Sequence, residues 1–311
     1  MATLKELTSR KECFVSGHRA CAGCGPAIAL RQILLAIDKP KVAAIATGCM
    51  EVVSTIYPYT AWNIPIIHSA FENAAATIAG IEAAYKAFKR KGKIDKEIKF
   101  IAFGGDGGTY DIGLQALSGA IERRHSFLYV CYDNEAYMNT GYQRSSATPS
   151  YAHTTTSPVG TQIPGKSQPR KDLTEIVIAH DPAYAAQANP AFFADLVKKV
   201  EKAMSKEGPT FINVIGPCVP GWGIASEKTV EVARLATETG FWPIYEWEDG
   251  KYKINYKPRE LKPLEDFLKL QARFRHLLRP ENKELLERFK KEIEKKWQRL
   301  LLKEKASQNA S

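Results

Sequence analysis

Residues 98–123, "IKFIAFGGDGGTYDIGLQALSGAIER", contain the pattern that decides the fold. The segment opens with a continuous apolar run, passes through glycines on both sides of Asp106, and continues with helical periodicity. A continuous apolar run is typical of a parallel strand that is buried on both faces. The segment therefore predicts a buried strand that places Asp106 at its carboxyl end, directly before a helix.

Further strands and helices alternate on either side of this segment. Apolar runs predict strands at residues 42–48, 126–134, 174–179 and 210–216. Helical patterns lie between them, at residues 26–37, 73–90, 111–123 and 190–206. Strands that alternate with helices form a mostly parallel sheet with helices on both faces. The predicted fold class is therefore α/β, with a doubly wound sheet.

The strand alternation fades after about residue 222. Residues 246–255, "EWEDGKYKIN", predict a hairpin with an Asp-Gly turn, and two charged helices follow. We predict an α/β domain at 1–225 and a C-terminal extension at 226–311. Residues 135–172 form a long polar stretch, and loops of that length inside a domain are usually functional or disordered.

Composition narrows the class of protein. The chain has 311 residues, of which 44% are hydrophobic and 25% charged, as in ordinary folded proteins. It contains no apolar run of about eighteen residues that could span a membrane, and its N-terminus does not have the pattern of a secretion signal. Its six cysteines are therefore expected to be metal ligands, catalytic thiols or core residues of a cytoplasmic protein.

The net charge of +10 is concentrated toward the C-terminus. Residues 241–311 hold 18 Lys and Arg against 12 Asp and Glu, so they contribute +6. Lys, Arg and Glu are interspersed there, which favours a solvated helix with i,i+4 ion pairs over a nucleic-acid surface. The partner class favoured by this charge is an acidic protein or a phosphorylated ligand.

The glycines around Asp106 predict a phosphate site. Glycine lets backbone amides approach a phosphate closely, and a helix N-terminus adds further N–H groups. An aspartate there would repel phosphate unless a cation such as Mg²⁺ lay between them. The next strand ends in "YDNEAYMNTG" (132–141), which supplies Asn134 and Asn139 at the same sheet edge. No GxGxxG or GxxxxGK[ST] pattern occurs, which argues against nicotinamide cofactors and ordinary NTPases.

Four cysteines form a second candidate site. Cys21 and Cys24 make a CxxC pair in "GHRACAGCGP" (17–26), and Cys49 and Cys218 each follow a predicted strand in a loop rich in glycine or proline. One pair and two distant cysteines form a Cys₄ ligand set. The residues alone leave a [4Fe–4S] cluster and zinc equally open, with a redox dithiol at the CxxC pair as a weaker third reading.

The Gly-Asp-Gly motif, followed by Asn at the end of the next strand, resembles the diphosphate–Mg²⁺ motif of thiamine diphosphate enzymes. The wider pattern "GDGGTYDIG…YDNEAYMNTGYQRSSATP" resembles the β subunit of the 2-oxoacid:ferredoxin oxidoreductases, most closely the pyruvate branch. The likeness covers roughly residues 14–240 and is weaker in the tail. It implies a fold of the thiamine diphosphate-binding (diphosphate-domain) type with a helical C-terminal extension.

The resemblance also implies roles for single residues. Asp106, Asn134 and the backbone carbonyl of Ala136 would bind Mg²⁺, and Asn139 would be catalytic and face the substrate. The thiamine diphosphate would lie along Thr47, Gly48, Gly105, Gly107, Gly108, Tyr137 and Thr140. The [4Fe–4S] cluster would be held by Cys21, Cys24, Cys49 and Cys218. The two remaining cysteines do not match the pattern: Cys131 is expected in the core, and Cys13 is an incidental thiol.

The implied reaction is the oxidative decarboxylation of a 2-oxoacid. Pyruvate would give acetyl-CoA and CO₂, with coenzyme A as acyl acceptor and ferredoxin as electron acceptor. Branched-chain or aryl 2-oxoacids, 2-oxoglutarate and oxalate are alternative substrates. Only the diphosphate-binding domain is evident, so an α subunit would supply the pyrimidine-side glutamate and the substrate carboxylate contacts, with further γ and δ subunits. Glu51, Glu72 and His68 are weaker candidates within this chain.

Two other classes of function stay open at this point. A non-redox thiamine decarboxylase would use the four cysteines for structural zinc, and the identity of the metal separates it from the oxidoreductase. A non-enzymatic scaffold would bind an acidic partner through the basic tail. Thiamine binding at Asp106 would count against that second alternative.

Overall fold

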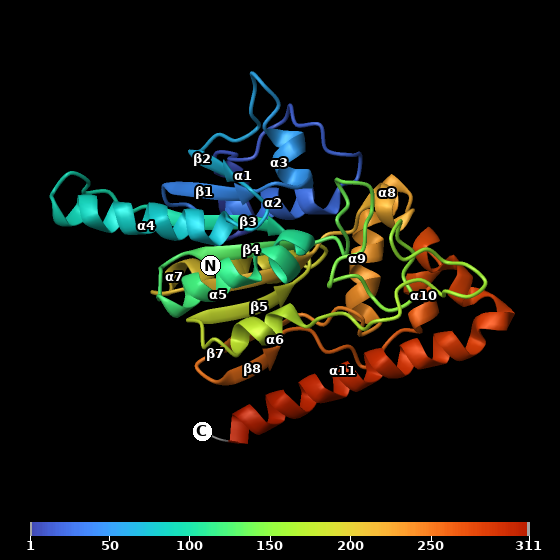
Figure 1. The fold of residues 1–311 in the computed structure, drawn as a ribbon. Coiled ribbons are helices and arrows are strands. Elements are labelled where there is room, and N and C mark those ends of the chain that lie inside the picture. Colours follow the sequence, from blue (N-terminus) through green and yellow to red (C-terminus); the bar gives the residue numbers. More distant parts are fainter. Residues whose placement is uncertain (1, 310–311) are drawn as a thin grey trace.

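One eight-stranded sheet forms the centre of the computed structural model, which describes residues 2–309 (Figure 1). The strands are β1 (Lys41–Ala46), β2 (Ile66–Ser69), β3 (Lys99–Gly105), β4 (Leu128–Asp133), β5 (Tyr184–Ala188), β6 (Thr210–Ile215), β7 (Tyr245–Glu248) and β8 (Lys251–Ile254). Their order is β2–β1–β3–β4–β6–β5–β7–β8. The strands from β2 to β5 in this order are parallel, while β7 and β8 pair antiparallel. The predicted mostly parallel sheet is confirmed.

Helices pack on both faces of the sheet, which confirms the doubly wound arrangement. The helices are α1 (Leu4–Ser9), α2 (Gly25–Ala36), α3 (Cys49–Ser54), α4 (Ala74–Arg90), α5 (Leu114–Glu122), α6 (Leu173–Ile178), α7 (Phe193–Ser205), α8 (Val219–Trp222), α9 (Thr229–Glu238), α10 (Leu264–Leu268) and α11 (Lys283–Asn309). A π-helical turn, Gly107–Ile112, precedes α5. Helices α2 and α7 share one hydrophobic core with the sheet, and α4, α5 and α6 share a second.

Strand β4 shows why the central strands have continuous apolar sequences. Successive side chains of a strand point to opposite faces. Val130 and Tyr132 accordingly lie in the core beneath α2 and α7, whereas Tyr129 and Cys131 lie in the core beneath α4 and α5. Since helices cover both faces, every residue of β4 is buried. The prediction that Cys131 belongs to the core is confirmed.

The strand predicted at 174–179 is wrong, because these residues form α6. Asp172 caps this helix by accepting a hydrogen bond from the backbone N–H of Glu175. The buried residues Leu173, Thr174 and Val177 recur at helical spacing. The strand in this part of the sheet is β5, whose sequence "YAAQA" is too rich in small residues to give an apolar run. The short edge strand β2 was also not predicted.

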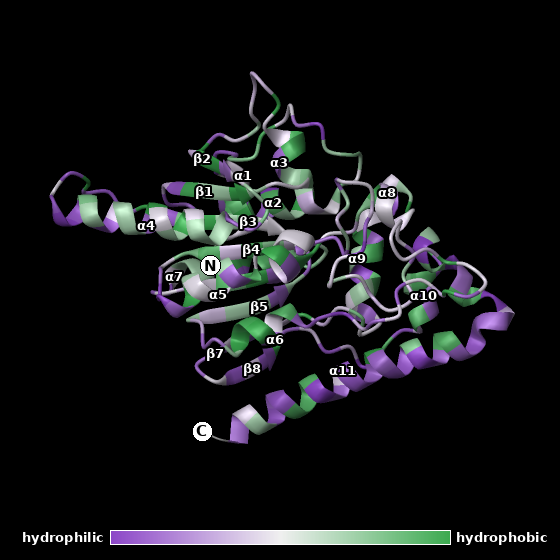
Figure 2. Ribbon diagram, in the orientation of Figure 1, coloured by the Kyte–Doolittle hydropathy of each residue, from purple (hydrophilic) through white to green (hydrophobic). Residues whose placement is uncertain are grey.

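The C-terminal segment lies against the sheet. The predicted hairpin is confirmed as β7 and β8, which continue the sheet beyond β5. Helix α11 runs along one side of the molecule (Figure 1), and Figure 2 shows apolar residues recurring along a mainly polar helix. Phe289, Ile293 and Trp297 are among its buried residues. The domain boundary at 225/226 stays a prediction.

The polar side of α11 carries ion pairs of the predicted kind. Arg288 pairs with Glu284 and Lys296 with Glu292, each four residues apart. Within residues 2–309, no helix combines the length and the apolar character that a membrane crossing requires.

Candidate cofactor site and cysteine cavity

The predicted cofactor residues meet at the carboxyl edge of the parallel sheet. Thr47 follows β1, Asp106 follows β3 and Asn134 follows β4, and β3 and β4 are direct neighbours. A cavity of about 30 Å³ opens there. Its lining includes every residue predicted to contact the cofactor or the substrate: Thr47, Gly48, Gly105, Asp106, Gly107, Gly108, Asn134, Ala136, Tyr137, Asn139 and Thr140.

Three oxygen atoms crowd together in this cavity. The side-chain oxygen of Asn134 lies 2.8 Å from Oδ1 of Asp106 and 2.8 Å from the carbonyl oxygen of Ala136. Neighbouring ligands of an octahedral Mg²⁺ at 2.0–2.1 Å lie about 2.9 Å apart, so these oxygens have the spacing of cation ligands. Turning the amide by 180° lets its NH₂ group donate to both oxygens, and hydrogen bonding favours that orientation. The carboxylate, the side-chain amide and the carbonyl are nevertheless groups that supply oxygen ligands to a small divalent cation.

The electrostatics of Asp106 also fit a cation. Burial, together with the negative charge of Asp133, raises the pKa of Asp106 well above its ordinary value. A hydrogen bond donated by Ser145 and the charge of Arg170 act in the opposite direction but do not outweigh burial. A bound divalent cation would favour the carboxylate form of Asp106.

Tyr137 holds the loop after β4 against the loop after β3. Its hydroxyl donates to the carbonyl oxygen of Gly107 at 3.0 Å. A Cβ on Gly107 would lie only 2.2 Å from the Tyr137 ring, so only glycine permits this contact. The loop after β4 is also held by the indole N–H of Trp222, which donates to the carbonyl oxygen of Asn134 at 2.8 Å.

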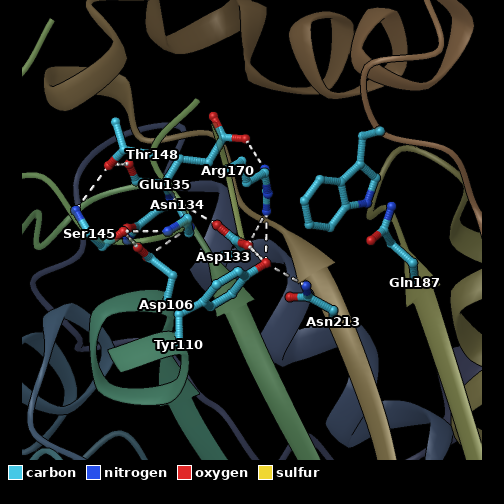
Figure 3. Close-up of polar contacts among 12 residues, drawn as sticks. Asp106, Tyr110, Asp133, Asn134, Glu135, Ser145, Thr148, Arg170, Gln187 and Asn213 are labelled. Carbon is cyan, nitrogen blue, oxygen red and sulfur yellow. Dashed lines mark hydrogen bonds and ion pairs between the residues drawn. The ribbon is translucent and has the colours of Figure 1, made fainter. Parts of the chain in front are cut away.

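A buried ionic network lies behind Asp106 and Asn134 (Figure 3). Arg170 pairs with both Asp133 and Glu135, and Arg273 pairs with the second oxygen of Glu135 at 2.6 Å. Tyr110 donates to Asp133 and accepts from Arg170 at 2.9 Å. Both carboxylates are fully buried. Since Asp133 and Glu135 flank Asn134, the network fixes the backbone that presents the Asn134 amide.

Sequence reasoning missed both arginines. Arg170 lies at the end of the polar stretch 135–172, and Arg273 lies in the C-terminal segment. Each is far along the chain from Glu135, so no local spacing connects them. The guanidinium of Arg273 lies 3.7 Å from the centroid of the Trp222 ring, which joins the C-terminal segment to the cofactor loops. Two buried acids in "YDNE" were the one available signal, because buried carboxylates need cationic partners.

The four predicted cluster ligands line one cavity of about 180 Å³. Cys21, Cys24, Cys49 and Cys218 all contribute to its wall. The backbone N–H of Gly25 donates to the carbonyl oxygen of Pro217 at 3.1 Å, which holds the CxxC turn beside the Cys218 loop. Among residues 2–309, no three His, Cys, Asp or Glu side chains converge closely enough to hold a single metal ion. The four thiols line the wall of this cavity.

Three of these thiols, those of Cys24, Cys49 and Cys218, are unfavourable as free thiolates. Burial raises the pKa of Cys24 to about 11 and that of Cys218 to about 12. Burial also raises the pKa of Cys49, and the charges of Cys218 and Cys24 raise it further. A bound cationic centre would reverse this balance, because a coordinating thiol is held in its deprotonated form.

The two cavities share a wall. Cys49, Asn134, Met138 and Asn139 line both the cofactor cavity and the cysteine cavity. Asn134 therefore belongs to the oxygen cluster and also borders the cysteines. Groups bound in the two cavities would be neighbours separated only by these side chains.

Glu51, Glu72 and His68, the weaker candidates for site residues within this chain, lie beside the cofactor cavity. Thr47 Oγ1 and His68 Nε2 are 2.9 Å apart, and Glu51 Oε1 lies 3.7 Å from His68 Nδ1. Glu51 also accepts a hydrogen bond from Thr55, and Glu72 accepts one from Asn73. Neither glutamate is among the residues that line the cavity.

Comparison with known proteins identifies the family. Residues 46–214 match the family described as "Thiamine pyrophosphate enzyme, C-terminal TPP binding domain". Pyruvate synthase subunit PorB of Thermotoga maritima is 51% identical, over 98% of this chain and 96% of its own length. This chain belongs to the pyruvate/2-oxoacid:ferredoxin oxidoreductase family, as a β subunit. It is thus one subunit of a multi-subunit enzyme.

Other relatives agree with this assignment. Pyruvate synthase subunit PorB of Methanocaldococcus jannaschii is 56% identical over 92% of this chain and 96% of its own. Ketoisovalerate oxidoreductase subunit VorB of Pyrococcus abyssi is 46% identical over 93% of each chain. A solved 2-oxoglutarate:ferredoxin oxidoreductase from Magnetococcus marinus has the same fold, with a TM-score of 0.55 and 19% identity over 72% of this chain and 79% of its own.

The buried ion pair between Arg273 and Glu135 is expected to stabilise the fold. Arg273→Gln removes one cation from Glu135 and leaves a buried carboxylate partly unpaired, which we expect to lower the free energy of unfolding by ~3 kcal/mol. Denaturant unfolding measures the change. Arg275→Gln, two residues along at an exposed position, is the matched control and should change it by about 0.5 kcal/mol or less. Equal effects of the two substitutions would contradict the role given to Arg273.

Proposed function

We propose that this chain binds thiamine diphosphate through Mg²⁺ and holds a [4Fe–4S] cluster beside it, as the β subunit of an enzyme that oxidatively decarboxylates pyruvate. The observation that carries the proposal is the shared wall between the oxygen cluster at Asp106 and the cysteine cavity. A cofactor that releases electrons and a centre that accepts them must be close together.

Asp106, Asn134 and the carbonyl of Ala136 would hold the Mg²⁺. Gly105, Gly107 and Gly108 line the same cavity and would let the diphosphate approach the backbone. Thr47, Gly48, Tyr137 and Thr140 would contact the rest of the cofactor, and Asn139 would face the substrate. When bound, thiamine diphosphate supplies the nucleophilic carbon and the electron sink for decarboxylation of a 2-oxoacid.

The four cysteines would hold the cluster. A tetrahedral zinc ion needs its sulfur ligands about 2.3 Å away, which brings all four to one point. Here the thiols surround a cavity of about 180 Å³, an arrangement that supports a larger iron–sulfur centre. The cluster would take electrons from the thiamine site and pass them toward ferredoxin, through further γ and δ subunits of the complex.

A partner subunit would complete the cofactor site. The cavity of about 30 Å³ at Asp106 is much smaller than the roughly 300 Å³ or more of typical ligand pockets. It fits the metal and phosphate end of a cofactor whose other end lies against another chain. We propose that an α subunit covers it and supplies the pyrimidine-side glutamate and the substrate carboxylate contacts, with coenzyme A as acyl acceptor, in the cytoplasm.

The relatives favour pyruvate as the substrate. PorB subunits of pyruvate synthase are 51% and 56% identical to this chain. A ketoisovalerate oxidoreductase subunit is 46% identical, so a branched-chain 2-oxoacid is the second candidate. The test is coenzyme A-dependent reduction of ferredoxin by the complete complex, with pyruvate and 2-oxoisovalerate compared. The higher kcat/KM should be for pyruvate, and a clear preference for 2-oxoisovalerate would reverse the assignment.

Asp106 is expected to be essential for cofactor binding. Asp106→Ala removes the one carboxylate of the predicted Mg²⁺ site, and the complex should lose its Mg²⁺-dependent thiamine diphosphate while keeping its iron. Cofactor stoichiometry and iron content measure the two effects. A variant that retains full cofactor stoichiometry would refute the site.

Cys49 and Cys131 provide a matched pair for the cluster. Cys49 lines the cysteine cavity, whereas Cys131 is buried in β4. Cys49→Ala should lose or convert the cluster, as measured by iron content and electron paramagnetic resonance. Cys131→Ala should keep it. If both substitutions cost the same amount of iron, the ligand assignment is wrong.

A further inference from the structure

Tyr132, in strand β4, has a buried hydroxyl group without a hydrogen-bond partner. The side chain is only 1% exposed and lines the cofactor cavity together with Asp106 and Asn134. A buried polar group without a partner is costly, and few occur in native proteins. The structure therefore contains an unused hydrogen-bonding group at the proposed cofactor site.

Tyr132 packs closely against two glycines of the site. A Cβ on Gly48 would lie 2.8 Å from the Tyr132 hydroxyl oxygen, and a Cβ on Gly105 would lie 3.2 Å from its ring. Gly48 follows β1 and Gly105 ends β3, so Tyr132 lies between the two loops predicted to run along the cofactor. The absence of both side chains brings the hydroxyl close to whatever occupies the cavity.

The hydroxyl is available as a donor. A tyrosine hydroxyl ordinarily has a pKa of about 10, so the group carries its proton at neutral pH. The backbone N–H of Met50 approaches the hydroxyl oxygen without forming a regular hydrogen bond, and an N–H group can only donate. The proton of Tyr132 therefore needs an acceptor, which the cavity would have to supply.

We infer that Tyr132 is a cofactor-binding residue whose hydroxyl donates a hydrogen bond to a diphosphate oxygen of the bound thiamine diphosphate. The inference rests on the proposed function. Among the groups of this cofactor, the diphosphate oxygens are the negatively charged acceptors, and the surrounding glycines and Mg²⁺ ligands are suited to phosphate. Tyr132 would thus add a neutral donor where Asp106 adds a negative charge.

The test uses the complete complex freed of cofactor by removing Mg²⁺. The dissociation constant of thiamine diphosphate is measured at fixed Mg²⁺ for the wild type and for Tyr132→Phe. A hydrogen bond to a charged group contributes about 1.5–3 kcal/mol, so the variant should bind about 10- to 100-fold more weakly. The inhibition constant of thiamine, which lacks the diphosphate, should be the same for both.

The melting temperature of the cofactor-free complex separates a binding role from a structural one. Removing a hydroxyl that has no partner should leave this temperature unchanged or higher, whereas loss of a structural hydrogen bond would lower it. Tyr129→Phe is the matched control on the same strand, because the Tyr129 hydroxyl is paired with Thr109 at 3.1 Å and faces the other core. It should leave the affinity for thiamine diphosphate unchanged.

The outcomes distinguish this inference from the proposed function. If Asp106→Ala abolishes cofactor binding but Tyr132→Phe binds within twofold of wild type, the Tyr132 inference alone fails. The same holds if Tyr132→Phe changes only the reduction potential of the cluster, since the hydroxyl would then donate to Cys49. If Asp106→Ala binds the cofactor normally, the cofactor site itself is misplaced.

Discussion

Parallel pairing of β1, β3, β4 and β6 brings the ends of four distant segments to one edge of the sheet. All strands of a parallel sheet point the same way, so the loops that follow them gather at the carboxyl edge. Asp106 and Asn134 follow neighbouring strands, and Cys49 and Cys218 follow β1 and β6. Both candidate sites, and the wall between them, depend on this arrangement.

The buried ion pairs behind that edge of the sheet hold the loop after β4 in position. Burial raises the pKa of Asp133 to about 6 even though Arg170 opposes the shift. Keeping the Asp133 carboxylate charged in the core therefore costs stability. Arg170 and Arg273 offset that cost and position the backbone around Asn134. The loop that carries Asn134 is therefore held in part by Arg273, from the C-terminal segment of the chain.

The sequence was informative where one local segment carries the signal. The glycines around Asp106 and the Asn134 motif predicted neighbouring strand ends, and the continuous apolar run predicted that β4 is buried. The sequence did not predict β5, because its small residues give no apolar run. It also did not predict that Arg273 pairs with Glu135, because the two residues are far apart along the chain. The role inferred for Tyr132 depends on Gly48, which follows β1, a strand that is not adjacent to β4 in the sheet.

The most direct test of the central claim is the iron and acid-labile sulfide content of the β subunit, separated without oxygen from its complex. The account places a [4Fe–4S] cluster against the thiamine site on this chain, so it predicts about four iron atoms and four sulfides per chain. Zinc with no sulfide would contradict it. The four cysteines would then be structural, and the thiamine site would have no adjacent electron acceptor on this subunit.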